Sequence, residues 1–351
     1  MSTSAAARLP SPPAWPGTRL GRLDQVAEVP LGTWPTPIQR VERRGKCDLL
    51  IKRDDLSGHG RGGAKTRKIS HLLGHVLARG YDELMIVAGN ITNLAFDIVP
   101  AVDACDLRTR IFIADDPPAS PRDREKIFEG IRARVDLLGG RHAQVASRLA
   151  CAYFDSRREG RRPFLALPGV SHPASVVGSA RGFLEMVRQL DARGESLPKA
   201  VFVTAATGTT VAGFLLAAHA LLCAGRDPIQ VVGVQVYPGN VRLRTLALVR
   251  WTERALGLPT AVPVDGRSFV GDAQLGFAAF DECVPYLCDR VKAELGLALD
   301  PIFGGKTWRA MEADPRANSV GARPVLYWHC GYTPEWRTLC RAVASASPRF
   351  S

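Results

Sequence analysis

Short runs of apolar residues recur along the chain and alternate with stretches in which apolar residues follow a helical spacing. Runs rich in Val, Ile and Leu predict buried strands at Leu84–Val87, Ile111–Ile113, Phe164–Ala166, Val201–Val203, Val231–Val234 and Val325–Tyr327. The clearest amphipathic helix has apolar residues on one face at Ile69, Leu72, Leu73, Val76 and Leu77. Such alternation is typical of parallel βαβ units, so we expect an α/β protein with a doubly wound sheet.

Composition narrows the class of protein. With 351 residues and a mean hydropathy of −0.02, the chain fits an ordinary globular protein. No apolar run is long enough to span a bilayer, and the first eighteen residues lack the apolar core of a signal peptide. We therefore expect a flexible tail over residues 1–18 and a cytoplasmic protein that does not bind membranes. None of the eight cysteines forms a Cys-x-x-Cys or zinc spacing, which favours reduced thiols and no metal site.

The net charge of +12 raises the question of nucleic acid. Only eight of the 46 basic residues are lysines, and the arginines are scattered without interleaved aromatic residues. We therefore interpret the charge as a solvated basic surface and expect no nucleic-acid partner. Because lysine is scarce in this chain, each position that has lysine instead of arginine is a candidate for a specific role.

Three segments could carry chemistry. The first, Gly62–Lys68, places two glycines and two lysines at the start of the amphipathic helix, where backbone amides and the helix dipole favour an anion. The second, Thr204–Gly213, is a Gly/Thr loop between a predicted strand and a helix, an arrangement that binds phosphate. The third, Ala88–Asn93, follows a strand with two amides and a hydroxyl. A solvated turn, a Thr-rich turn and an N-cap are the respective structural alternatives.

Together the three segments suggest one ligand that has a phosphate, polar edges and a group that the amine of Lys65 can attack. Pyridoxal 5'-phosphate meets these requirements, because its aldehyde condenses with lysine and its ring withdraws electrons from the α-carbon of an amino acid. A small amino acid is then the expected substrate.

Three motifs resemble the 1-aminocyclopropane-1-carboxylate deaminase and D-cysteine desulfhydrase family: Pro30–Arg40, Ile51–Gly58 and Gly62–Lys68. That family consists of fold-type-II pyridoxal-phosphate enzymes similar to the tryptophan synthase β subunit. The resemblance extends from about Pro30 to about Gly331. It implies a two-lobed α/β fold with twisted parallel or mixed sheets flanked by helices. A smaller domain of residues 68–175 would be inserted into a larger one of residues 19–67 and 176–351, and the enzyme would be a homodimer.

The resemblance also implies roles for individual residues. Lys65 is similar to the Schiff-base lysine and Lys68 to a phosphate contact. Asn93 matches an asparagine that contacts the cofactor, whereas Thr92 and Ser171 match serines near the substrate. The phosphate cradle would consist of Ala206, Thr207, Gly208, Thr209 and Thr210. His329 could line the site, although a lone histidine there is more often structural.

The departures from the family pattern bear on the reaction. Phe303 stands where the deaminases have a tyrosine, and Gly304 where they have a glutamate facing the pyridine nitrogen; Leu275 falls near a further family tyrosine. Ala64 replaces an asparagine and Leu94 a glutamine or histidine. Because a carboxylate at the pyridine nitrogen strengthens electron withdrawal, its loss disfavours cyclopropane opening. We therefore expect β-elimination or β-replacement, with a non-catalytic cofactor-binding relative and a true deaminase as alternatives.

Overall fold

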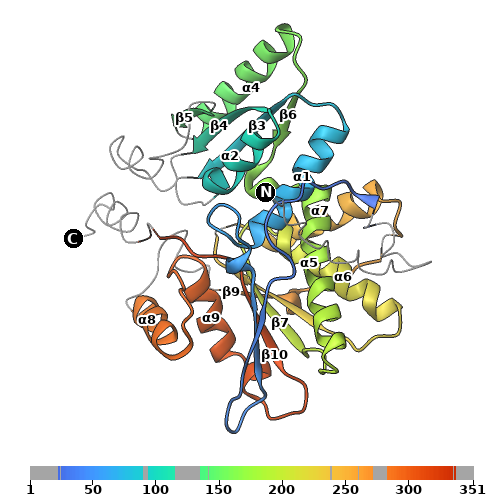
Figure 1. The fold of residues 1–351 in the computed structure, drawn as a ribbon, viewed down its shortest axis with the longest axis vertical. Coiled ribbons are helices and arrows are strands. Elements are labelled where there is room, and N and C mark those ends of the chain that lie inside the picture. The colour runs from blue at the N-terminus through green and yellow to red at the C-terminus, as the bar shows by residue number, and fades with distance from the viewer. Residues whose placement is uncertain are drawn as a thin grey trace, which may run out of the picture.

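Two separate β-sheets form the frame of the protein (Figure 1). The structure is a computed structural model that describes residues 23, 25–89, 94–114, 135–140, 142–237, 239–259, 261–271, 283–334 and 336. Thr92, Asn93 and Leu275 lie outside the described residues, as do residues 1–18 of the predicted tail.

The larger sheet has six described strands in the order β1-β2-β10-β7-β8-β9. Their bounds are β1 Ile38–Val41, β2 Leu49–Arg53, β10 Val325–His329, β7 Ala200–Ala205, β8 Gln230–Gln235 and β9 Phe269–Gly271. Only β1 and β2 pair antiparallel; the other neighbours are parallel, so the sheet is mixed. The carboxyl ends of β2, β10 and β7 therefore lie side by side at one edge, where α/β proteins usually bind ligands.

The smaller sheet has four described strands, all parallel, in the order β5-β4-β3-β6. Its strands are β3 Glu83–Gly89, β4 Arg108–Ala114, β5 Val135–Gly140 and β6 Pro163–Ala166. The chain thus enters the larger sheet with β1 and β2, builds the smaller sheet, and returns to the larger one at β7. The domain boundaries at residues 68 and 175 stay a prediction.

Helices cover both faces of each sheet. Successive side chains of a strand point to opposite faces, so they pack in different hydrophobic cores. The helices are α1 Ala64–Ala78, α2 Leu94–Ala104, α4 His142–Arg158, α5 Pro173–Ala192, α6 Thr209–Cys223, α7 Val241–Ala255, α8 Cys283–Leu295, α9 Gly304–Ala313 and α10 Pro315–Asn318. In β7, Val201 and Val203 pack in the core formed with α5, α6 and α7, whereas Phe202 packs in the core formed with α8 and α9. In the smaller sheet, Ile86 faces α1 and α2, and Met85 faces α4.

The six predicted strands and the amphipathic helix are confirmed, as is the α/β class. The strands β1, β2, β5 and β9 were not predicted, because each is short or carries polar residues within it. Of the two cysteines in α8, Cys288 is buried and Cys283 is exposed. Among the described helices, none is both long and apolar enough to cross a membrane.

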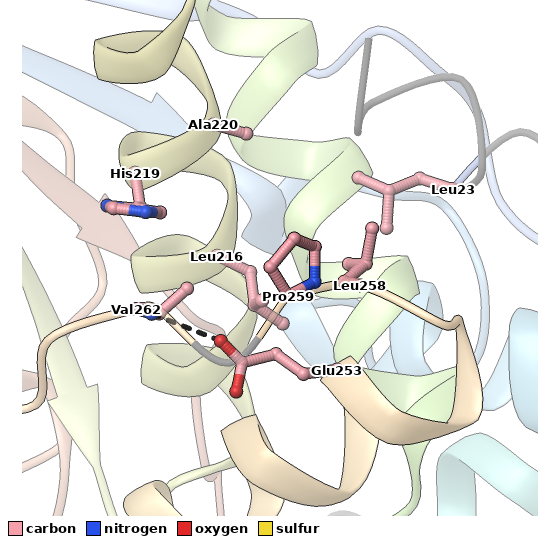
Figure 2. Close-up of a pocket in the computed structure, with 8 residues that line it drawn as sticks. All are labelled: Leu23, Leu216, His219, Ala220, Glu253, Leu258, Pro259 and Val262. Atoms are coloured by element: carbon pink, nitrogen blue, oxygen red, sulfur yellow. Dashed lines mark hydrogen bonds between the residues drawn. The ribbon is translucent and has the colours of Figure 1, made fainter.

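A small apolar pocket is lined by residues of α6 and α7 together with Leu23, Leu258, Pro259 and Val262 (Figure 2). Glu253 in its wall is engaged locally: one carboxylate oxygen accepts the amides of Ala261 and Val262, both at 3.1 Å, and the other pairs with Arg250 at 2.7 Å. None of the predicted site residues lines this pocket.

Candidate functional site

The start of α1 lies directly against the carboxyl end of β10. The amide of Ala64 donates to the carbonyl oxygen of Cys330 at 3.0 Å, and the amide of Gly63 donates to Ser57 Oγ at 3.0 Å. Gly63 has φ of 111°, and a Cβ there would lie 2.2 Å from the Cys330 oxygen. Only glycine allows this approach. The first turn of α1, with Lys65, is therefore fixed at the ligand-binding edge of the larger sheet.

Lys65 and Lys68 differ in their exposure. Lys65 is partly exposed, whereas Lys68 is buried at 8% exposure. Burial, together with the neighbouring charge of Lys65, lowers the pKa of Lys68 to about 8. Among the described residues, no carboxylate forms an ion pair with either lysine. A buried ammonium without an anion is costly, so this position is suited to a ligand that brings negative charge.

Arg67, between the two lysines, anchors α1 on its other side. Its guanidinium donates to both oxygens of Asp54, at 2.9 and 3.0 Å, and to both oxygens of Glu185, at 2.8 and 2.9 Å. Lys52 also pairs with Glu185 at 2.6 Å, and Trp328 Nε1 donates to Asp54 at 2.8 Å. Burial opposes ionisation of Asp54, but Arg67, Lys52 and Trp328 together outweigh burial and lower the pKa of that carboxyl. This buried cluster of two cations and two carboxylates holds α1 against β2, β10 and α5.

Hydroxyl groups gather at the amino end of α6. Gly208 caps the helix in the left-handed conformation, with φ of 89°, and as a glycine it provides no side-chain cap for the first amides of the helix. Thr209 Oγ1 lies 3.2 Å from Thr207 Oγ1 and 3.0 Å from Ser171 Oγ. Ser171 comes from the turn that follows β6, at the edge of the smaller sheet. A positive helix end beside clustered hydroxyls is suited to binding an anion.

Cys330 links the lysines to this cradle. It follows β10, and burial raises the pKa of its thiol to about 11. A backbone hydrogen bond from Thr204 and the charges of Lys68 and Lys65 act on the same thiol. Thr204 lies at the end of β7, two residues before the cradle begins. The two lysines and the Ala206–Thr210 loop therefore lie around the same adjoining strand ends.

Gly304 begins α9, on the opposite side of the larger sheet from α5 and α6. Its carbonyl accepts the Tyr327 hydroxyl at 3.1 Å, and a Cβ at this position would lie 3.3 Å from both Tyr327 Oη and Leu299 Cδ2. Asp300 shapes the preceding turn by accepting the amides of Ile302 and Phe303 at 3.0 and 2.8 Å. Burial raises the pKa of Asp300 to about 6, although the backbone amides of Phe303, Thr333 and Ile302 and the charge of Lys65 oppose this rise.

His329 has a structural environment. Its ring is buried, Nε2 lies 3.1 Å from the carbonyl oxygen of Ala298, and Nδ1 accepts the amide of Gly331 at 3.3 Å. Sequence reasoning missed Asp97, Asp300 and Cys330, which the fold brings toward the lysines. The carboxylate of Asp97 lies four residues after the Thr-Asn pair, and this spacing is the signal that could have indicated it.

These residues fit pyridoxal phosphate. The phosphate matches the cradle at α6 and the unpaired cation of Lys68, and the aldehyde matches the partly exposed amine of Lys65. Comparison with known proteins leads to the same class. A family model described as pyridoxal-phosphate dependent enzyme matches residues 29–331, so the chain belongs to this family.

Individual relatives indicate which members of this family the chain resembles. The chain is 30% identical over 331 residues to a 1-aminocyclopropane-1-carboxylate deaminase of Ralstonia nicotianae, covering 87% of this chain and 94% of the relative. It is 28% identical over 330 residues to a putative deaminase of the same name from Pyrococcus abyssi, covering 90% and 93%. A crystal structure of an ACC deaminase homologue has a TM-score of 0.77 at 24% identity, covering 92% and 97%. The resemblance, cofactor and fold predicted from the sequence are confirmed.

Proposed function

We propose that this pyridoxal-phosphate enzyme is a lyase or β-replacement enzyme that acts on a small amino acid carrying a leaving group on its β-carbon. The proposal depends chiefly on one observation: the partly exposed amine of Lys65 lies beside the buried, unpaired cation of Lys68 at strand ends that also carry a hydroxyl-lined helix terminus. When bound, the cofactor supplies an electron-withdrawing ring that weakens bonds at the α-carbon.

Different residues of the chain would bind the cofactor, bind the substrate and transfer the proton. Lys65 would hold the cofactor and move the proton of the substrate α-carbon. Lys68 and the Ala206–Thr210 cradle would hold the phosphate. Ser171 and Thr92 would contact the substrate, and Asn93 the cofactor ring.

The surroundings of Gly304 support β-elimination over cyclopropane opening. Leu299 and the Tyr327 hydroxyl occupy the space around this glycine, so a longer acidic side chain would require them to move. A site without a carboxylate here supports weaker electron withdrawal. Loss of a good β-leaving group needs less from the ring than opening a cyclopropane. The names of the relatives favour the alternative, a 1-aminocyclopropane-1-carboxylate deaminase.

We extend the proposal to organisation and location. The domain boundaries at residues 68 and 175, a homodimeric state and a cytoplasmic location follow from the family resemblance and the cysteine pattern. The sheet topology supports the first of these, because β3, β4, β5 and β6 form a sheet of their own between β2 and β7 of the chain.

A substrate panel tests the reaction. The cofactor-loaded protein would be incubated with D- and L-cysteine, D-serine, O-acetylserine, chloroalanine and 1-aminocyclopropane-1-carboxylate, and keto acid and ammonia would be measured. We expect turnover of at least one β-substituted amino acid and little turnover of the cyclopropane. Turnover of the cyclopropane alone would favour the deaminase, and inertness to the whole panel would favour a non-catalytic relative.

A further inference from the structure

Thr245 carries a buried hydroxyl that has no hydrogen-bond partner among the described residues. The residue lies in the second turn of α7 and is 0% exposed. Other buried hydroxyls on helices of this chain donate to the carbonyl oxygen four residues earlier: Thr252 to Leu248 at 2.7 Å, and Ser179 to Ser175 at 3.2 Å. Because buried polar groups are normally satisfied, the hydroxyl of Thr245 requires an explanation.

The Thr245 hydroxyl faces the cap of α6. A Cβ added at Gly208 would lie 2.5 Å from Thr245 Oγ1 and 3.2 Å from the Thr245 backbone nitrogen, so a glycine is needed for α7 to approach this closely. Gly208 precedes the first turn of α6, where backbone amides lack partners within the helix and the helix dipole is positive. The unpartnered hydroxyl therefore lies against the helix end at which the Ala206–Thr210 cradle is formed.

The other hydroxyls at this helix end already have partners. Thr207 and Thr209 flank Gly208 along the chain, and their hydroxyl oxygens are 3.2 Å apart. Thr209 Oγ1 also lies 3.0 Å from Ser171 Oγ. The Thr245 hydroxyl, in contrast, has no acceptor in the part of the chain that the structure describes. A phosphate group, with negative charge and several acceptor oxygens, matches a donor of this kind beside a helix amino end.

We propose that the Thr245 hydroxyl donates to the phosphate of pyridoxal phosphate and so extends the cradle from α6 to α7. This inference rests on the proposed function, because it requires that the cradle holds that phosphate. The bound phosphate would satisfy a hydroxyl that is otherwise buried without a partner, and a hydrogen bond to a charged acceptor is stronger than one between neutral groups. The competing occupant is a buried water molecule, which would satisfy Thr245 without contributing to phosphate affinity.

Thr245→Val tests the proposal, because valine has nearly the shape of threonine but lacks the hydroxyl. Calorimetry on the cofactor-free protein measures the binding of inorganic phosphate, pyridoxal phosphate and pyridoxal, and needs no turnover. We expect the dissociation constants of the two phosphate compounds to rise about tenfold, the effect of one hydrogen bond to a charged group. The dissociation constant of pyridoxal should not change. Thr245→Ser, which keeps a hydroxyl, should retain most of the phosphate affinity.

Thr252→Val is the matched control, because it removes a buried hydroxyl from the same helix at a position where the hydroxyl has a partner. It should leave all three dissociation constants unchanged. Unchanged phosphate affinity in Thr245→Val would overturn the inference and favour the buried water. If the wild type bound neither phosphate compound, the proposed phosphate site itself would be contradicted, and this inference with it.

Thermal unfolding separates a ligand contact from a structural role of Thr245. The cofactor-free Thr245→Val variant should unfold at the temperature of the wild type or above it, because the substitution removes an unpaired buried hydroxyl. A structural role would instead lower the unfolding temperature together with the phosphate affinity. A clear drop in the unfolding temperature of the cofactor-free variant would therefore contradict the inference.

Discussion

At the scale of single residues, the unusual group is the buried ammonium of Lys68. Its pKa of about 8 lies below the ordinary lysine value of 10.5, chiefly because of burial. The folded state thus binds this proton less tightly than the unfolded chain does. The stability cost is full below the folded pKa and disappears as pH rises toward 10.5. An anionic phosphate would offset it.

We predict that Lys68→Met stabilises the cofactor-free protein while weakening cofactor binding. At pH 7 the gain in unfolding free energy should be about 2–3 kcal/mol, shrinking as pH approaches 10, because the variant removes a buried charge. Affinity for pyridoxal phosphate should fall at least about tenfold. Urea denaturation and cofactor titration measure the two effects. If Lys68→Met left cofactor affinity intact, Lys68 would not be a phosphate contact.

At the scale of elements, the site depends on how closely the start of α1 approaches β10. Gly63 permits the contact, and the Arg67 cluster holds the helix from its other side. The sequence predicted α1 and the strand at Val325–Tyr327 from their apolar patterns. It could not predict their contact, because the partners are more than 250 residues apart in the chain.

Gly63→Ala should displace α1 and impair the site. The added Cβ would collide with the Cys330 carbonyl at a backbone position that already disfavours alanine, so we expect a loss of more than about 2 kcal/mol and weaker cofactor binding. Gly45→Ala is the matched control, because Gly45 also has positive φ, at 72°, but no atom lies within 4 Å of its added Cβ. Equal effects of the two substitutions on cofactor affinity would contradict the importance of the α1–β10 contact.

The strands missed from the sequence have a physical explanation at the same scale. In β2, Lys52 and Arg53 interrupt the apolar run, yet Lys52 is fully buried because Glu185 and Gln189 of α5 neutralise and solvate it. These partners lie more than 130 residues away.

At the scale of the whole molecule, the cofactor would join parts that are distant in the chain: Lys65 from α1, the cradle from the β7–α6 loop, and Ser171 from the edge of the smaller sheet. The class of protein and its cofactor could be predicted from the sequence, because short local motifs indicate both. The strand order β2-β10-β7 could not be predicted, because the chain leaves the larger sheet after β2, builds the smaller sheet, and only then returns to the larger sheet.

Cofactor binding should therefore stabilise the entire fold. At a hundredfold excess over its Kd, pyridoxal phosphate should add about 2.7 kcal/mol and raise the Tm by several degrees. Pyridoxal, which lacks the phosphate, should give a smaller shift at the same concentration. Equal shifts from the two compounds would show that the cradle at α6 and Lys68 do not hold the phosphate.

The central claim is that Lys65 holds the cofactor. The most direct measurement is to reduce the cofactor-loaded protein with borohydride, digest it, and locate the modified lysine by mass spectrometry. With only eight lysines in the chain, the assignment is unambiguous. We predict that the cofactor is found on the peptide containing Lys65 and is absent from Lys65→Ala. Modification of Lys68, Lys306 or another lysine in the wild type would contradict the account.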